Sequence, residues 1–124
     1  MLRDSQISAY VPVSDVEKGR AFYEGVLQQQ PREVGPAGVL YECANGSTFF
    51  MYLSGGAGTS QASCAFWSVA DVEKEVVELK ERGVTFEHYD FPGMDGDIAT
   101  AGGAKSAWFK DPDGNTLALI QPLG

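Results

Sequence analysis

The stretch Ala107–Gln121, AWFKDPDGNTLALIQ, decides the fold because it contains a strand, a tight turn and a second strand. Pro112 fixes φ within the turn, and Asp113, Gly114 and Asn115 accept the left-handed conformations that a chain reversal needs. Apolar runs flank the turn on both sides. The stretch therefore predicts a β-hairpin close to the C-terminus.

Other parts of the chain occur twice. Val13–Lys18 (VSDVEK) returns 56 residues later as Val69–Lys74 (VADVEK), and each copy follows an apolar run and opens a helical pattern. Asn45–Phe49 (NGSTF) returns 68 residues later as Asp113–Leu117 (DGNTL). The second copy is thus about 12 residues longer, and we place the extra length in the Gly-rich loop 90–103. A period above 50 residues that occurs twice indicates a duplicated module.

Periodicity and turn residues predict the element order β-α-β-β-β in each module. Strands are expected at residues 7–13, 30–34, 38–43 and 48–53 in the first module, and at 62–69, 84–89 and in the C-terminal hairpin in the second, with a weaker strand at 98–100. Asp15 and Asp71 are placed to cap helices that run to about Leu27 and about Arg82. The modules then span about 6–54 and 61–122, with residues 55–60 as the linker, inside one domain of 124 residues.

Composition excludes several classes of function. The chain has 9 Lys and Arg against 17 Asp and Glu, a net charge of −8, which argues against binding to nucleic acid or to an anionic membrane. The start of the chain lacks the apolar stretch of a secretion signal, and no apolar run approaches transmembrane length. Cys43 and Cys64 are too few for a disulfide framework, so we expect reduced, buried thiols. A soluble, cytoplasmic protein is expected.

Two βαβββ modules, paired DVEK helix starts and an FKDPDGN hairpin together resemble the vicinal oxygen chelate superfamily. That superfamily includes glyoxalase I, extradiol dioxygenases, fosfomycin resistance enzymes and the bleomycin resistance proteins. The resemblance covers essentially the whole chain. It implies an α+β fold in which two βαβββ modules form an open barrel-like sheet around a cavity, commonly as a homodimer, in a bacterial protein.

The resemblance also gives the positions where metal-dependent members hold a divalent ion. Those ligands lie seven residues before each helix-capping Asp and four residues after each turn glycine. The corresponding residues here are Ser8, Cys64, Phe50 and Ala118. A catalytic metal site needs about three ligands drawn from His, Asp, Glu or Cys, and this set supplies one thiol. We therefore expect no metal and no cofactor.

Because side chains alternate along a strand, the same register sorts residues into two faces. The face that would line the cavity carries aromatic, small and hydroxyl side chains, which suits a planar or largely apolar ligand. The expected ligand-binding residues are Ser8, Tyr10, Phe50, Tyr52, Cys64, Phe66, Ser68, His88, Trp108 and Ala118. The face expected to pack beneath the helices carries Val11, Val13, Phe49, Met51, Trp67, Val69, Phe109, Leu117 and Leu119. In the alternative interpretation, the aromatic residues merely fill the barrel or a dimer interface.

His88, the only histidine, lies at the start of a loop that also carries Glu87, Asp90, Asp95 and Asp97. These acids are either solvated or form an acidic lid that favours a ligand with a cationic group. The sequence places no Ser or Cys nucleophile at a recognisable spacing from the one histidine, so it gives no support for a catalytic triad.

Two classes of function remain. We expect a small-molecule binding protein similar to the bleomycin resistance proteins, which sequesters an aromatic or cationic natural product or antibiotic without chemistry. The alternative is a metal-dependent lyase, transferase or dioxygenase of the same superfamily, or a metal-free enzyme that uses His88, Cys64 or Tyr52. The expected partners are the small molecule and a second copy of the chain, with no nucleic acid and no membrane.

Overall fold

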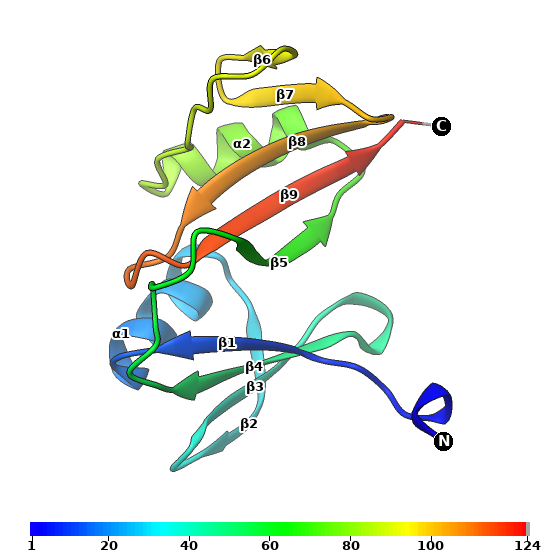
Figure 1. Cartoon of the computed structure of the whole chain (residues 1–124). Helices are drawn as coiled ribbons and strands as arrows, with labels where there is room; N and C mark the ends of the chain where they lie inside the picture. The colour runs from blue at the N-terminus through cyan, green and yellow to red at the C-terminus, as the bar shows by residue number, and fades with distance from the viewer. Residues whose placement is uncertain (124) are drawn as a thin grey trace.

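The structure, a computed structural model, describes residues 1–123. It contains two mixed sheets and two main helices. In Figure 1, the sheet of the second half lies above the sheet of the first half. The elements of the first half are β1 (Ala9–Val13), α1 (Val16–Arg20), β2 (Gln30–Gly35), β3 (Gly38–Glu42) and β4 (Thr48–Leu53). Those of the second half are β5 (Ser63–Ser68), α2 (Val72–Glu81), β6 (Met94–Asp95), β7 (Ile98–Ala101), β8 (Ala104–Lys110) and β9 (Thr116–Pro122).

The two sheets have the same strand order. The first runs β1-β4-β3-β2 and the second β5-β9-β8-β7, with β6 added at the outer edge. In each, the strand before the helix pairs in parallel with the last strand, and the other pairings are antiparallel. This arrangement confirms the predicted α+β class. The module limits 6–54 and 61–122 remain our proposal.

Both helices begin where the aspartates predict. Asp15 accepts a hydrogen bond from the Lys18 amide at 3.2 Å, and Asp71 accepts one from the Lys74 amide at 3.1 Å. A capping carboxylate satisfies an amide that has no partner inside the helix. After α1 the chain continues as a π-helical turn, Ala21–Val26, so the helical segment has the predicted length. Beyond α2, Gly83 takes φ +93°, which ends that helix as expected.

The prediction of a strand at residues 84–89 was wrong. In this segment only Phe86 pairs, through an isolated bridge to Phe109 of β8. The segment resembles a strand in sequence because Val84 and Phe86 alternate with polar residues. Both side chains are buried in the core, but the backbone of the segment forms no continuous strand pairing. The strand that lies beside β8 is instead β7, which pairs with residues 104–106 at the start of β8.

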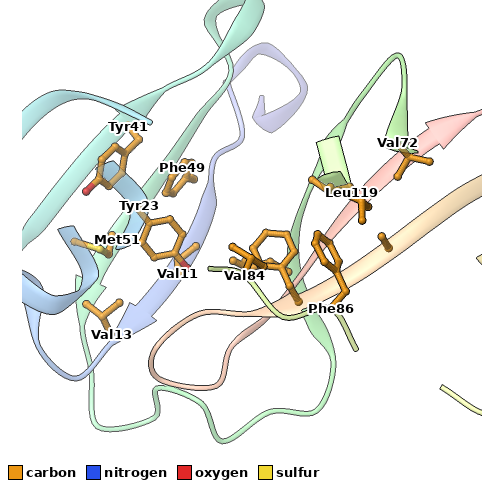
Figure 2. Packing of buried hydrophobic residues seen from close by; sticks show 14 of the residues in the cluster. Val11, Val13, Tyr23, Tyr41, Phe49, Met51, Val72, Val84, Phe86 and Leu119 are labelled. Atoms are coloured by element: carbon orange, nitrogen blue, oxygen red, sulfur yellow. The ribbon is translucent and has the colours of Figure 1, made fainter. Parts of the chain in front are cut away.

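One core connects the two halves of the chain. The residues predicted to pack beneath the helices are buried or packed against this core, as expected. Phe49 of β4 lies 6.1 Å from Trp67 of β5, and Phe22 lies 6.5 Å from Phe109 of β8, between ring centroids. Figure 2 shows the buried side chains continuing from one sheet to the other. The sheets therefore share the core through their helix-side faces.

The turn between β8 and β9 fastens the two halves together. Its Asn115 donates from Nδ2 to the Pro12 carbonyl of β1 at 2.7 Å and accepts from the Gly58 amide of the linker at 3.0 Å. Asp111, at the start of the turn, accepts from the Tyr23 hydroxyl at 2.7 Å. The stretch that predicts the hairpin thus also joins β1, the linker and the first helical segment.

Strand β2 forms the free edge of the first sheet, and all six of its residues are exposed. Its pairing with β3 is interrupted by a bulge between Pro31 and Glu33. Proline lacks the amide that a ladder requires, so the strand is suited to an edge.

Candidate ligand-binding site

The side of each sheet that faces away from the shared core is called its outer face. On the outer face of the first sheet, Tyr10, Phe50 and Tyr52 form a group that we call the first aromatic cluster. The ring of Tyr10 stacks on Tyr52 at 3.8 Å and lies 5.9 Å from Phe50, between centroids. Tyr10 is 62% exposed, so much of this residue remains open to solvent. Ser8 continues this face, and its hydroxyl accepts a hydrogen bond from Thr48 at 3.0 Å.

On the outer face of the second sheet, Phe66, Ala118 and Trp108 form one row. Strand pairing puts Ala118 between the other two, opposite Phe66 of β5 and Trp108 of β8. Ala118 is buried and Phe66 is 59% exposed. The small side chain of Ala118 thus separates the two aromatic residues, and Phe66 remains open to solvent.

Two further aromatic residues cover Trp108. The ring of Tyr89 lies 5.3 Å from Trp108 and that of Phe91 lies 6.1 Å away, both edge to face. We call Trp108, Tyr89 and Phe91 the second aromatic cluster. Sequence reasoning treated residues 87–97 as an acidic loop and missed these two contacts. The available signal was two aromatic residues, two positions apart, in an otherwise polar segment.

Cys64 lies where the alternation of β5 is broken. A register shift between Ser63 and Ala65 makes Cys64 the extra residue of a bulge, half-buried against the core. Burial, and to a lesser degree the negative charge of Asp111, raises the pKa of the Cys64 thiol. A protonated thiol is a poor nucleophile and a poor metal ligand. Cys43 is likewise free and half-buried.

Three of the predicted residues border one cavity. A space of about 320 Å³ lies where β1 and β5 begin, and its walls include Ser8, Cys64 and Phe66. The two sheets meet along these strands. This cavity therefore connects the outer face of the first sheet with that of the second.

Ser68 and His88 lie apart from the aromatic clusters. Ser68 borders a separate crevice of about 240 Å³, which Trp67 and Leu79 of α2 also line. His88 is exposed, and its Nε2 is 2.6 Å from Asp97 Oδ1. Asp97 also accepts from Lys80 of α2 at 2.8 Å. The histidine thus takes part in holding the long loop to α2.

The four positions that bind metal in related enzymes do not fit an ion here. Ser8, Phe50 and Ala118 offer at most one weak oxygen ligand, and the Cys64 thiol is kept protonated. Among residues 1–123, no group of three His, Cys, Asp or Glu side chains lies close enough to hold a metal ion.

The sequence from residue 6 to residue 119 matches the model of the Glyoxalase/Bleomycin resistance protein/Dioxygenase superfamily. The chain belongs to this family. A comparison with curated protein sequences gives no match.

Similar solved structures share the fold at low identity. A bleomycin resistance determinant encoded on transposon Tn5 is 22% identical, with a TM-score of 0.74 over 95% of this chain and 98% of that one. TnmS3, an antibiotic binding protein from Streptomyces sp. CB03234, is 24% identical, with a TM-score of 0.72 over 94% and 96%. UcmS2 is 17% identical, with a TM-score of 0.72 over 93% and 97%. These likenesses confirm the predicted fold and leave the ligand to be argued from the site.

Proposed function

We propose that this chain binds a small, planar aromatic molecule, such as a natural product or antibiotic, and sequesters it without chemistry. The exposure of Tyr10 and Phe66 on the two outer faces carries this proposal. Contiguous exposed apolar patches mark interaction sites, and aromatic side chains supply the stacking surface that a planar ligand needs. The antibiotic binding protein TnmS3 and the bleomycin resistance determinant, both similar in structure to this chain, support it.

Of the two kinds of ligand predicted, the aromatic one has the better support. The carboxylate of Asp97 already pairs with both Lys80 and His88. An acid held by two partners offers little to an incoming cation. Within residues 1–123, no helix is long and apolar enough to cross a membrane, and we propose no membrane or nucleic-acid partner.

A homodimer would complete the site. The chain exposes 7660 Å², whereas a compact monomer of this mass is expected to expose about 6,500 Å². The excess is comparable to the surface that one partner contributes to an ordinary interface, about 800 Å². We propose that the outer face of the first sheet in one chain covers that of the second sheet in its partner, so that each ligand contacts the first aromatic cluster of one chain and the row of Phe66, Ala118 and Trp108 of the other.

Binding is tested with N-phenyl-1-naphthylamine, an uncharged aromatic dye whose fluorescence rises in an apolar site. Tyr10→Ala and Phe66→Ala each remove one outer-face ring and are expected to weaken binding about tenfold. Val77→Ala, which removes an exposed apolar side chain from α2, is the matched control and should change nothing. Absence of dye binding by the unchanged protein would refute the proposal.

Mixing the two variants tests whether a site is shared between chains. After joint refolding, a heterodimer of Tyr10→Ala and Phe66→Ala chains carries one site with both defects and one with neither. About a quarter of the sites would then regain full affinity. If each site lies within one chain, the mixture stays as weak as its components.

A further inference from the structure

A cavity of about 410 Å³ adjoins the second aromatic cluster. Its walls are the linker residues 58–61, Tyr89 of the long loop, and Lys110 and Thr116 of the hairpin. Tyr89 belongs to both features, since its ring also contacts Trp108. The cavity is therefore an extension of the outer face of the second sheet.

The lining of this cavity differs in charge from the rest of the chain. The protein as a whole carries a net charge of −8. Among the lining residues, Lys110 has the only charged side chain, and the others offer hydroxyl, amide, phenol or backbone groups. In an acidic protein, the side chains that line this space thus carry one positive charge and several hydrogen-bond donors. Such a lining favours an anionic group over a cationic one.

The linker wall of the cavity is held rigidly. Gly58 takes φ +72°, and a Cβ placed on it would collide with the carbonyl oxygen of Asp113. Its amide donates to Asn115 at 3.0 Å. A wall fixed by a glycine-only contact and a hydrogen bond need not be ordered when a ligand enters, and this lowers the cost of binding.

Lys110 is placed to reach a substituent on a stacked ring. It follows Trp108 by two residues in β8, so both side chains leave the same face, about 7 Å apart along the strand. Thr116 is the cross-strand partner of Lys110. Glu87 competes for Lys110, since its Oε1 lies 3.3 Å from Lys110 Nζ in a pair that is partly exposed on both sides. Such pairs contribute little, so a ligand anion can share or replace this contact.

We propose that the ligand of this protein is an aromatic anion. Its ring lies against the second aromatic cluster, and its carboxylate, sulfonate or phenolate group is held by Lys110 and Thr116. This inference rests on the proposed binding of an aromatic molecule and specifies the charge of that molecule.

The test compares two dyes with the same ring system. N-phenyl-1-naphthylamine is uncharged, and 8-anilinonaphthalene-1-sulfonate carries one sulfonate. We expect the unchanged protein to prefer the sulfonate dye, and Lys110→Gln to reduce that preference about fivefold. Lys105→Gln is the matched control, because Lys105 lies on the same strand and pairs with Glu73 of α2. Glu87→Gln removes the competing carboxylate and should strengthen binding of the sulfonate dye alone, about twofold.

Each outcome decides between the proposals. A preference that falls in Lys110→Gln, persists in Lys105→Gln and rises in Glu87→Gln supports the inference. Equal affinity for the two dyes, or an unchanged preference in Lys110→Gln, overturns it while leaving aromatic binding intact. Failure of both dyes to bind contradicts the proposed function and this inference with it. Melting temperatures of the variants show whether each has kept its fold.

Discussion

Asn115 shows what one residue of the turn contributes beyond the turn itself. Its side chain donates to Pro12 and to Asp111, at 2.7 and 2.8 Å, and accepts from Gly58. The sequence pattern predicts a residue that tolerates a reversal here. It does not predict these partners, because Pro12 and Gly58 lie 103 and 57 residues away in the chain.

Asn115→Asp keeps the shape of the side chain but replaces two N–H donors with oxygen. Because Asn115 is buried beside Asp111, the new carboxylate would face a second acid and the Pro12 carbonyl. We expect a loss of about 2–3 kcal/mol in the free energy of unfolding, measured by urea denaturation. Asn45→Asp, the same change in an exposed turn, is the control. Equal stability of the two variants would show that the contacts of Asn115 are dispensable.

At the scale of elements, the Gly-rich composition of the linker, residues 55–60, is typical of a flexible connection between modules. The structure shows that part of it is held against the hairpin turn through Gly58. A Gly-rich composition permits flexibility, but it equally permits a close approach of two backbones. Composition alone does not distinguish these cases, since the deciding contact, Asp113, lies in a distant segment.

Gly58→Ala tests this packing. The added Cβ would collide with the Asp113 carbonyl oxygen, and alanine is strained at φ +72°. We expect destabilisation of about 2 kcal/mol or more, read from thermal unfolding. Gly55→Ala is the matched control, because nothing lies within 4 Å of a Cβ at that position. A variant at Gly58 as stable as the control would mean that the linker moves freely.

The long loop is a second element whose role depends on distant contacts. Asp97 joins it to Lys80 of α2 and to His88, and these hydrogen bonds hold the pKa of Asp97 below its usual 3.8. Since the pKa is lower in the folded state, the stabilisation is complete above pH 3.8 and is lost as pH falls through the lower folded value. The loop that carries Tyr89 and Phe91 should therefore loosen in acid.

Asp97→Asn should loosen the same loop at neutral pH. We expect limited proteolysis within residues 87–97 to become about threefold faster, because local opening exposes the backbone. Asp95→Asn, an exposed change in the neighbouring strand β6, should cleave at the original rate. If the two variants are cleaved equally, Asp97 does not anchor the loop.

At the scale of the whole molecule, local patterns predicted more of the fold than of the site. The sequence repeats, the helix-capping aspartates and the alternation of apolar residues were sufficient to predict two sheets, both helices and the residues of the core face. The strand at residues 84–89 was mispredicted because buried Val84 and Phe86 have strand periodicity without a free partner strand. Tyr89, Phe91 and Lys110 were missed because their contacts form only when loop, linker and hairpin meet.

Because both outer faces expose aromatic side chains, we expect two chains to associate through them. We expect sedimentation at micromolar concentration to give a species of about 27 kDa, twice the chain mass. The double variant Tyr10→Glu, Phe66→Glu places charges on both faces and should sediment as a folded monomer, with its circular dichroism spectrum retained. A monomeric unchanged protein would contradict the shared site.

The free edge of the first sheet bears on how the protein behaves when it is concentrated. An open row of backbone donors and acceptors can add strands from other molecules and start a fibril. In β2, Pro31 has no amide hydrogen to donate, and Arg32 and Glu33 are charged. The bulge between Pro31 and Glu33 also interrupts the regular spacing that an added strand would need. The sequestration that we propose requires the protein in amounts that match its ligand. We expect this interrupted edge to let the protein accumulate without assembling into β-aggregates.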